Sequence, residues 1–210
     1  MSERITKRAV PYGYLVMLPS APRGRPRDSR AHRAILTAAT ELVTDVGYAA
    51  ASIGAVAARA GVGKDTVYRR WSCKAELVYE AVFTEAEACL VPDTGSLTGD
   101  LTALLEALIQ EFSAPAAAAA LPGLLADFAA NPELQARIRS EFLAPAKDGL
   151  VAVFERAVQR GDTDPNVPVD LVLDTLAGAV FFHIGLVGVQ PSRQLAAQLA
   201  AIVGRGIETR

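Results

Sequence analysis

Residues 52–71 contain two short helical patterns separated by only three residues, and this feature constrains the fold more than any other. After Ser52, which can cap a helix, apolar side chains recur at helical spacing at Ile53, Val56, Ala57 and Ala60. Gly61-Val62-Gly63 then ends this helix early, and a second short helix is predicted from Lys64 to Trp71. Two short helices joined by a tight glycine-containing turn are typical of a helix-turn-helix.

The spacing inside this unit fits the packing of one helix on the other. A small residue is needed at Ala57, where the second helix crosses, and Gly61 can adopt the positive φ of the turn. Val67 and Trp71 share one side of the second helix, so we predict that both are buried. An ordinary helical hairpin is the alternative interpretation.

The opposite side of the second helix carries groups that suit DNA. Asp65, Thr66, Arg69 and Arg70 point away from the predicted core, with Lys64 and Tyr68 at the border. Arginine can pair bidentately with guanine, while tyrosine and lysine can hold phosphate oxygens. Asp65 either accepts a hydrogen bond from the amino group of a cytosine or stabilises the N-terminus of its helix, and we favour the second role.

The charge distribution also divides the chain. Residues 1–74 carry 13 basic and 5 acidic side chains, whereas residues 75–210 carry 8 and 18. This asymmetry predicts an anion-binding part joined to a different one, with chance variation of the surface as the alternative. We therefore expect a flexible basic arm over 1–28, a helix-turn-helix domain over 29–74 and a second domain over 75–210.

The arm is rich in proline and glycine, which disfavour helices and strands. Its run Arg23-Gly24-Arg25-Pro26-Arg27 resembles the core of an AT-hook, so Arg25 and Arg27 are candidate minor-groove contacts. A solvated basic tail explains the same residues equally well. Met17 offers an alternative start of translation.

The rest of the chain predicts an all-α fold. Helical spacing runs from Ser29 to Val46, with Gly47 as the stop, and no segment alternates as a strand does. Alanine dominates the apolar residues, which favours helices. Five further helices are predicted, over 100–112, 116–130, 132–160, 169–187 and 192–207. We expect a kink or break at Pro145 within the helix 132–160.

Membrane and secretory segments are not expected. The most apolar run, Leu176–Val189, has 14 residues, and a bilayer requires about 20. The apolar stretch near the N-terminus, between Pro11 and Pro19, is too short for a signal peptide. The two cysteines form no disulfide framework, so we expect a cytoplasmic protein with reduced thiols. A redox role for Cys73 is the weaker alternative to a neutral substitution.

The stretch Ile35–Val82 resembles the DNA-binding domain of the TetR family of transcriptional regulators. The matching residues include Gly47-Tyr48, Ser52-Ile53, Ala60-Gly61-Val62, Thr66-Val67-Tyr68 and Lys74-Ala75-Glu76-Leu77. The resemblance implies a three-helix DNA-binding domain, a linking fourth helix and a larger helical domain that binds a ligand and dimerises.

The resemblance also implies roles for single residues. Ser52 would cap its helix and touch phosphate, Tyr68 and Lys74 would bind phosphate, and the groove would be faced by Lys64, Asp65, Thr66 and Arg69. Arg70 stands where histidine is common. Gly63 and Ser72-Cys73 depart from the family pattern, and the second departure predicts a looser start of the fourth helix, because cysteine caps poorly.

The acidic part suggests a dimer and an apolar ligand site. Segment 169–187 is apolar on nearly every face, and the resemblance implies that 169–187 and 192–207 form a homodimer interface. Ligand sites are mostly apolar, so our candidate contacts are Phe112, Phe128, Phe142, Phe154, Phe181, Phe182 and His183. These phenylalanines are alternatively plain core, and His183 is alternatively a hydrogen-bonded core or interface histidine.

No enzyme, cofactor or metal is expected, because the sequence has no Gly-rich phosphate loop and no Cys/His metal spacing. The favoured function is a dimeric regulator that binds a palindromic operator on double-stranded DNA and is released by a small molecule. Repression rather than activation rests on the resemblance alone. The alternatives are an architectural or constitutive DNA-binding protein without an effector, and a helical enzyme or carrier with a vestigial DNA-binding domain.

Overall fold

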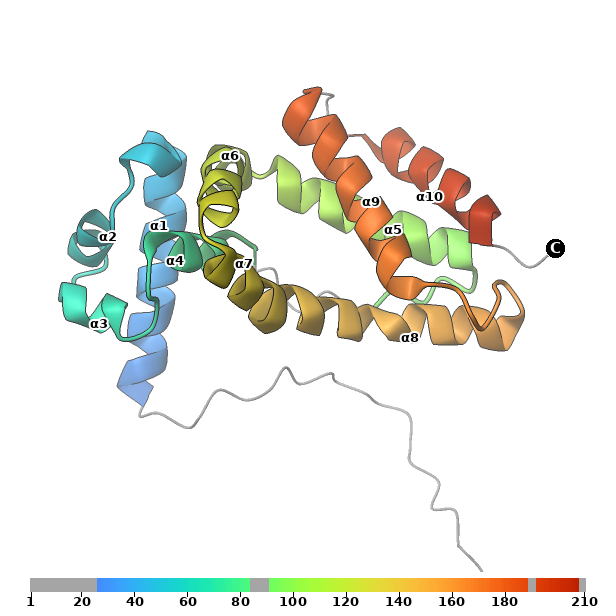
Figure 1. The fold of residues 1–210 in the computed structure, drawn as a ribbon, viewed down its shortest axis with the longest axis horizontal. Helices are drawn as coiled ribbons and strands as arrows, with labels where there is room; N and C mark the ends of the chain where they lie inside the picture. The colour runs from blue at the N-terminus through green and yellow to red at the C-terminus, as the bar shows by residue number, and fades with distance from the viewer. Residues whose placement is uncertain (1–25, 84–90, 189–191, 208–210) are drawn as a thin grey trace, which may run out of the picture.

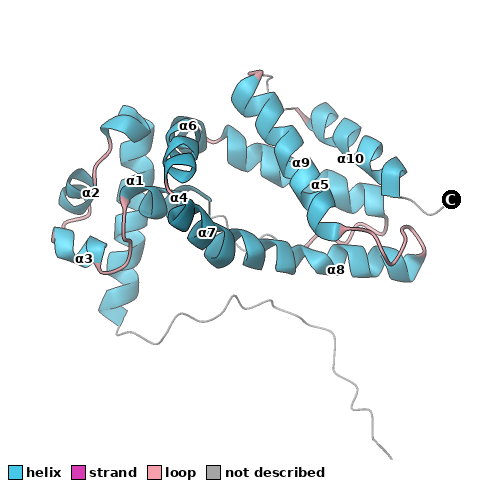
Figure 2. Cartoon of the chain, in the orientation of Figure 1, coloured by secondary structure: helices cyan, strands magenta, loops and turns pink. Residues whose placement is uncertain are grey.

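The computed structural model describes residues 26–83, 91–188 and 192–207, and every regular element in these ranges is a helix (Figures 1 and 2). The predicted all-α fold is confirmed. In chain order the helices are α1 (Pro26–Ala50), α2 (Ile53–Arg59), α3 (Lys64–Tyr68), α4 (Lys74–Phe83), α5 (Leu97–Ser113), α6 (Pro115–Ala130), α7 (Pro132–Ile138), the π-helical turn η1 (Arg139–Leu143), α8 (Ala144–Arg160), α9 (Val169–Phe181), the π-helical turn η2 (Phe182–Leu186) and α10 (Arg193–Ile207).

The first helix begins three residues before the predicted start, at Pro26. Proline is tolerated there because the N–H groups of the first turn have no partner inside the helix. Gly47, with φ of +78°, interrupts the helix where the sequence predicted its end, and a final turn to Ala50 follows. The expected arm therefore overlaps α1, and the rest of it, residues 1–25, lies outside the described residues.

Two hydrophobic clusters organise the molecule. The first joins α1–α4 to α6 and α7, with Ile35, Trp71 and Leu124 among its buried side chains. The second joins α5, α8, α9 and α10. Figure 1 shows the two groups at opposite ends of the molecule, with α2 and α3 farthest from α10. The fourth helix thus packs with the helix-turn-helix and with two helices of the acidic part.

Ion pairs hold the loop before α5 against α8. Asp100 is fully buried, accepts a hydrogen bond from the Thr94 N–H at 2.6 Å and lies 3.3 Å from a guanidinium nitrogen of Arg160. Asp162 also pairs with Arg160 at 2.8 Å. A buried carboxylate requires such partners, because an unpaired charge away from water is strongly unfavourable.

The predicted long helix over 132–160 is divided into α7, η1 and α8. The N–H of Ala144 bonds to the carbonyl of Arg139, five residues back, immediately before Pro145. Because proline has no N–H and its ring clashes with the preceding turn, a π-helical turn accommodates it without ending the helical path. The predicted irregularity at Pro145 is therefore a π-helical turn.

Val169–Leu186 is long and apolar enough to span a membrane, which the count of 14 residues had not indicated. Length and composition alone do not identify a span, because the core and interface helices of soluble proteins meet the same criterion. This segment carries Asp170 and Asp174, and Lys147 of α8 lies 2.6 Å from Asp174. Only 22% of it is buried, so its apolar surface is largely uncovered in a single chain.

Candidate nucleic-acid interface and effector site

The helix-turn-helix is built from short-range capping and a few buried contacts. Ser52 caps α2, since its hydroxyl accepts a hydrogen bond from the Ala55 N–H at 3.2 Å. Gly61 has φ of +68°, the conformation that the turn requires and that favours glycine. Val67 and Trp71 are buried, as predicted from their shared side of the second helix. These contacts fix how α3 is presented.

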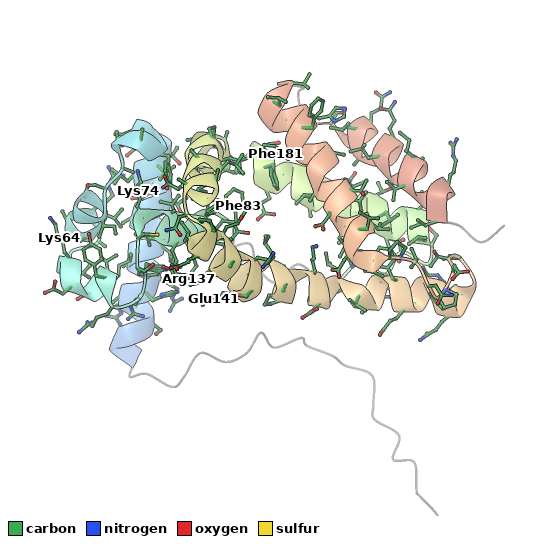
Figure 3. The ribbon with its side chains drawn as sticks, viewed as in Figure 1. Lys64, Lys74, Phe83, Arg137, Glu141 and Phe181 are labelled. Atoms are coloured by element: carbon green, nitrogen blue, oxygen red, sulfur yellow. The ribbon has the colours of Figure 1, made fainter. Side chains whose placement is uncertain are left out.

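The outer face of α3 is polar and accessible. Lys64, Asp65 and Arg69 are exposed, and Thr66 and Arg70 are half-buried. Figure 3 shows Lys64 at the end of the molecule farthest from α10. Tyr68 is 54% exposed, which leaves a large ring and a hydroxyl facing solvent beside the basic groups. An exposed surface of arginine, lysine, threonine and tyrosine provides the donors that base edges and phosphates accept.

Lys74, the predicted phosphate contact, is engaged within the chain. Its ammonium group donates a hydrogen bond to the carbonyl oxygen of Tyr48 at 2.9 Å and lies 4.0 Å from the centroid of the Tyr48 ring. The cation–π contact and the hydrogen bond both hold the start of α4 against the end of α1. The expected phosphate contact of Lys74 remains a prediction. Arg25 and the side chain of Arg27 lie outside the part of the chain that is described.

Trp71 anchors the end of the recognition unit to α1 and α4. Its indole Nε1 donates a hydrogen bond to the carboxylate of Glu80 at 2.6 Å. The ring of His32 stacks on the indole, with 5.2 Å between the ring centroids. His32 also lies 3.1 Å from Glu80. Burial alone would raise the pKa of Glu80, but the hydrogen bonds with His32 and Trp71 outweigh it and hold this pKa below its ordinary value. His32 is thus a packing residue of this domain, which its place near a basic arm did not indicate.

The start of α4 is closed by a carboxylate rather than left loose. Glu76 is buried and accepts hydrogen bonds from the Ser72 N–H at 2.7 Å and the Ser72 hydroxyl at 2.6 Å. Arg137 of α7 donates to the Ser72 oxygen at 2.8 Å, and its Nε lies 3.6 Å from Glu76. The predicted looseness was wrong, because Glu76 supplies the cap that Cys73 cannot. This cap also joins the DNA-binding part to α7.

A second link joins α1 to α6. The Tyr48 hydroxyl donates to the carboxylate of Asp127, and its ring lies against Gly123, where any side chain would clash. Burial, followed by the bond to Asp127, raises the pKa of Tyr48 above its ordinary value. The hydroxyl therefore stays protonated and remains a donor. Tyr48 thus contacts both Lys74 and α6.

Some of the predicted ligand contacts come together and others do not. Phe112, Phe128 and Phe142 belong to one aromatic cluster, in which Phe83 lies 5.8 Å from Phe112, and Tyr79 lies 6.0 Å from Phe128 and 5.3 Å from Phe142. We call these five residues, Tyr79, Phe83, Phe112, Phe128 and Phe142, the seam cluster, because they connect the two hydrophobic clusters. In the view of Figure 3, Phe83 lies between α6 and α9.

The other candidates are placed elsewhere. Phe154 is buried in the second cluster, and Phe181 packs over Gly185 of η2. Phe182 is exposed, with its ring 6.0 Å from that of His183. His183 lies 2.9 Å from the Ala179 carbonyl through its Nδ1, a contact within its own helix. These four residues do not join the seam cluster.

Sequence reasoning missed three residues at the seam: Tyr79, Phe83 and Glu111. Tyr79 and Phe83 are four residues apart and 5.3 Å from each other, so the helical spacing of α4 could have paired them. Glu111 precedes Phe112, and burial raises its pKa from its ordinary value to about 7. The charge of Glu111 also raises the pKa of Tyr79, after the larger effect of burial. In the described ranges, no group of three or more His, Cys, Asp or Glu could hold a metal ion.

Two family models match nearly all of the described chain. Residues 35–81 match "Bacterial regulatory proteins, tetR family", and residues 91–203 match "Tetracyclin repressor-like, C-terminal domain". The first match contains the helix-turn-helix, and the second contains α5 to most of α10.

Curated relatives and a solved structure agree with these models. The chain is 33% identical to the DNA-binding transcriptional repressor TetR of Mycobacteroides abscessus over 156 residues, 71% of this chain and 79% of that one. It is 28% identical to the HTH-type transcriptional regulator AqdR of Rhodococcus erythropolis over 188 residues, 89% and 90% of the two chains. The crystal structure of the TetR family transcription regulator SCO0332 superposes with a TM-score of 0.71 at 25% identity, covering 86% of this chain and 100% of that one.

Proposed function

The chain belongs to the TetR family of transcriptional regulators, and from this premise we propose that it is a repressor that leaves a palindromic operator when a small molecule binds. Members of the family are DNA-binding regulators, generally repressors, and not enzymes. The observation that carries the proposal is the exposed polar face of α3, set on the buried side chains of Val67 and Trp71. A rigid helix with one solvated basic face is what major-groove reading requires.

In this proposal the residues of the DNA face divide by role. Arg69 and Lys64 read base edges, with Thr66 and Arg70 beside them. Tyr68, Ser52 and Lys74 hold phosphates and set the position of α3 on the duplex. Asp65 stabilises the start of α3, where a negative charge meets the positive end of the helix. Arg25 and Arg27 reach the neighbouring minor groove.

The proposed active form is a homodimer through 169–187 and 192–207. Large apolar side chains of these segments are exposed in the single chain, including Leu171 at 63%, Leu186 at 71% and Ile202 at 70%. Large apolar side chains exposed on helices that contact each other, as α9 and α10 do, favour an association surface. A two-fold dimer would present two copies of α3 to a palindrome, about one or more DNA turns apart.

The proposed effector enters at the seam cluster. The helix that carries Tyr79 and Phe83 also carries Glu76, whose carboxylate binds the segment between α3 and α4. A ligand that displaced one end of α4 would therefore alter the other end, which positions the recognition helix. The ligand can shift DNA binding only by the difference between its affinities for the two forms.

We assign the DNA-binding domain to 29–74, preceded by the basic arm 1–28, and the ligand-binding and dimerisation domain to 75–210. The first cluster supports a mechanical connection between these parts, because α4 and α6 pack against α1 and α7 packs against α6. We propose a cytoplasmic location, where such regulators meet the chromosome.

The test is selection of bound duplexes from a random pool at two salt concentrations, with the wild type and an Arg69→Ala variant. Enrichment of a palindrome by the wild type, with affinity falling steeply as salt rises, is the expected result. An Arg139→Ala variant, which removes an exposed arginine outside both the DNA face and the proposed dimer segments, is the matched control and should select the same palindrome. Binding without any enriched sequence would favour the architectural alternative, which the arginine-rich arm supports.

A further inference from the structure

The side chain of Tyr48 contacts helices from both parts of the chain. Tyr48 lies near the end of α1 and is only 6% exposed. Its ring packs directly on the backbone of α6 at Gly123, and the same ring faces the ammonium group of Lys74, the first residue of α4. Tyr48 therefore lies between a helix of the acidic part and a group that we assign to the DNA face.

Two residues of α6 fix the ring of Tyr48. A Cβ atom at Gly123 would lie 2.1 Å from the ring carbon Cδ1 and 2.8 Å from Cγ and Cε1. Carbon atoms in van der Waals contact are about 3.5–4.0 Å apart, so any side chain at this position would displace the ring. Asp127, one turn later on α6, accepts the hydrogen bond of the Tyr48 hydroxyl. The position of the ring is thus set by α6.

The partners of Lys74 leave its charge uncompensated. Its Nζ donates a hydrogen bond to the carbonyl oxygen of Tyr48 at 2.9 Å and lies 4.0 Å from the ring centroid, and both of these partners are neutral. Within the described ranges, Lys74 forms no ion pair with a carboxylate. An ammonium group has three N–H donors, so two donors and the full charge are left for a phosphate.

Holding the lysine in advance should favour phosphate binding. A free lysine side chain loses rotamer freedom when it contacts a ligand, and this loss opposes binding. The Lys74 ammonium is already held by the ring and the carbonyl group of one residue. Its position therefore depends on where that residue lies.

We propose that Tyr48 is a positioning residue for DNA binding, which holds the Lys74 ammonium ready for a phosphate at a place set by Gly123 and Asp127. This inference rests on the proposed function, which includes the phosphate contact of Lys74. It adds that α6, a helix of the part assigned to ligand binding and dimerisation, sets one contact of the DNA face. Displacing the Tyr48 ring from α6 should therefore remove a phosphate contact, although no group that touches DNA is changed.

The test is the salt dependence of DNA binding by the full chain, on the duplex that the wild type selects and on a random-sequence duplex of equal length. The slope of log K against log salt is about −0.9 for each phosphate contact, so it counts contacts. Gly123→Ala should weaken binding to both duplexes about tenfold and make the slope shallower by about 0.9, as Lys74→Ala should. Gly149→Ala on α8, where an added Cβ meets no atom within 4 Å, is the matched control and should keep the wild-type affinity and slope.

A double variant separates positioning from a general loss of stability. If Gly123→Ala acts through Lys74, adding Lys74→Ala should cause no further change in the slope. Destabilisation of the fold would instead lower the active fraction, which a stoichiometric titration measures, and would leave the slope of the active molecules unchanged.

A second pair of variants introduces no clash. Asp127→Asn and Asp127→Ala remove the same negative charge, but only asparagine retains an oxygen that can accept a hydrogen bond from the Tyr48 hydroxyl. Asp127→Asn should keep the wild-type slope. Asp127→Ala should make the slope shallower and should bind both duplexes about threefold more weakly than Asp127→Asn. This pair decides the matter if Gly123→Ala does not fold.

A wild-type slope in Gly123→Ala, a further loss when Lys74→Ala is added, or equal affinities of the two Asp127 variants would each overturn the inference. If Lys74→Ala weakens binding to the selected duplex and Gly123→Ala does not, the positioning role fails while the regulator stands. If the wild type enriches no sequence, the proposed function fails. The random-sequence duplex then still tests the positioning role, because phosphate contacts carry no sequence information.

Discussion

Arg137 of α7 donates a hydrogen bond to the hydroxyl oxygen of Ser72, immediately after the recognition unit, across 2.8 Å. Sixty-five positions separate the two residues in the chain. The same Ser72 hydroxyl donates to the buried carboxylate of Glu76 at 2.6 Å. One guanidinium therefore connects α7 to the segment that places α3.

Replacing Arg137 with alanine should destabilise the protein and uncouple the two parts. Glu76 would stay buried with its positive neighbour gone, which we expect to lower the free energy of unfolding by about 1–3 kcal/mol. Urea unfolding measures this change. Arg139→Ala, two residues later on an exposed position, is the control and should leave the midpoint within experimental error. Equal urea midpoints for both variants would show that the Arg137 contact does not contribute to the free energy of unfolding.

The hydroxyl of Tyr48 should contribute to stability through Asp127. Tyr48→Phe removes the donor and leaves a half-buried carboxylate without it, so the free energy of unfolding should fall by about 1–2 kcal/mol. A double-mutant cycle with Asp127→Ala isolates the pair, and the second substitution should cost little once the first is present. Additive losses would mean that the two groups do not interact.

Replacing Arg69 and replacing Tyr68 should change DNA binding in different ways. Arg69→Ala should relax preference at particular base pairs by about 1–3 kcal/mol, because a base contact is lost. Tyr68→Phe should weaken binding to every sequence alike and reduce the salt dependence by about one contact. Titrations of the selected operator and its single-base variants at two salt concentrations distinguish these patterns. A uniform loss for Arg69→Ala would contradict its base-reading role.

Glu111 should make the stability of the protein depend on pH. Its pKa is about 7 in the folded chain and near 4.5 when unfolded, so the folded state binds the proton more tightly. Stability should therefore fall as pH rises from about 4.5 to about 7 and then level off. Glu111→Gln should remove that slope and raise the free energy of unfolding at pH 8 by about 1–2 kcal/mol, after allowance for solvent screening. Urea unfolding at pH 5, 6, 7 and 8 measures both effects, and a parallel pH profile for the variant would exclude Glu111 as their source.

An acidic residue on the exposed apolar surface should break the proposed dimer. Leu186→Asp removes a buried leucine from each subunit of a two-fold interface, so the dimer dissociation constant should rise about 100-fold or more. Analytical ultracentrifugation gives the oligomeric state, and operator affinity should fall with it. Val46→Asp introduces the same charge at an exposed apolar residue of α1, outside this surface, and should leave the oligomeric state unchanged. A wild type that sediments as a monomer at micromolar concentration would reject this interface.

The local parts of the structure were determined by the sequence itself. Ser52 caps α2, Gly61 adopts a positive φ, and Val67 and Trp71 turn inward, all as their spacing predicted. Each of these features depends on residues within a few positions of one another. Helical periodicity, capping and turn chemistry act over that range, so they can be read directly from the chain.

The proposed effector site depends on tertiary structure alone. Phe112, Phe128 and Phe142 meet Tyr79 and Phe83, whereas Phe154 and Phe182 are equally apolar and lie elsewhere. The same holds for the contacts of Arg137 with Ser72 and of Tyr48 with Asp127, which join residues 65 and 79 positions apart. Which face of one helix meets another depends on the angles at which helices pack, and no local pattern encodes these angles.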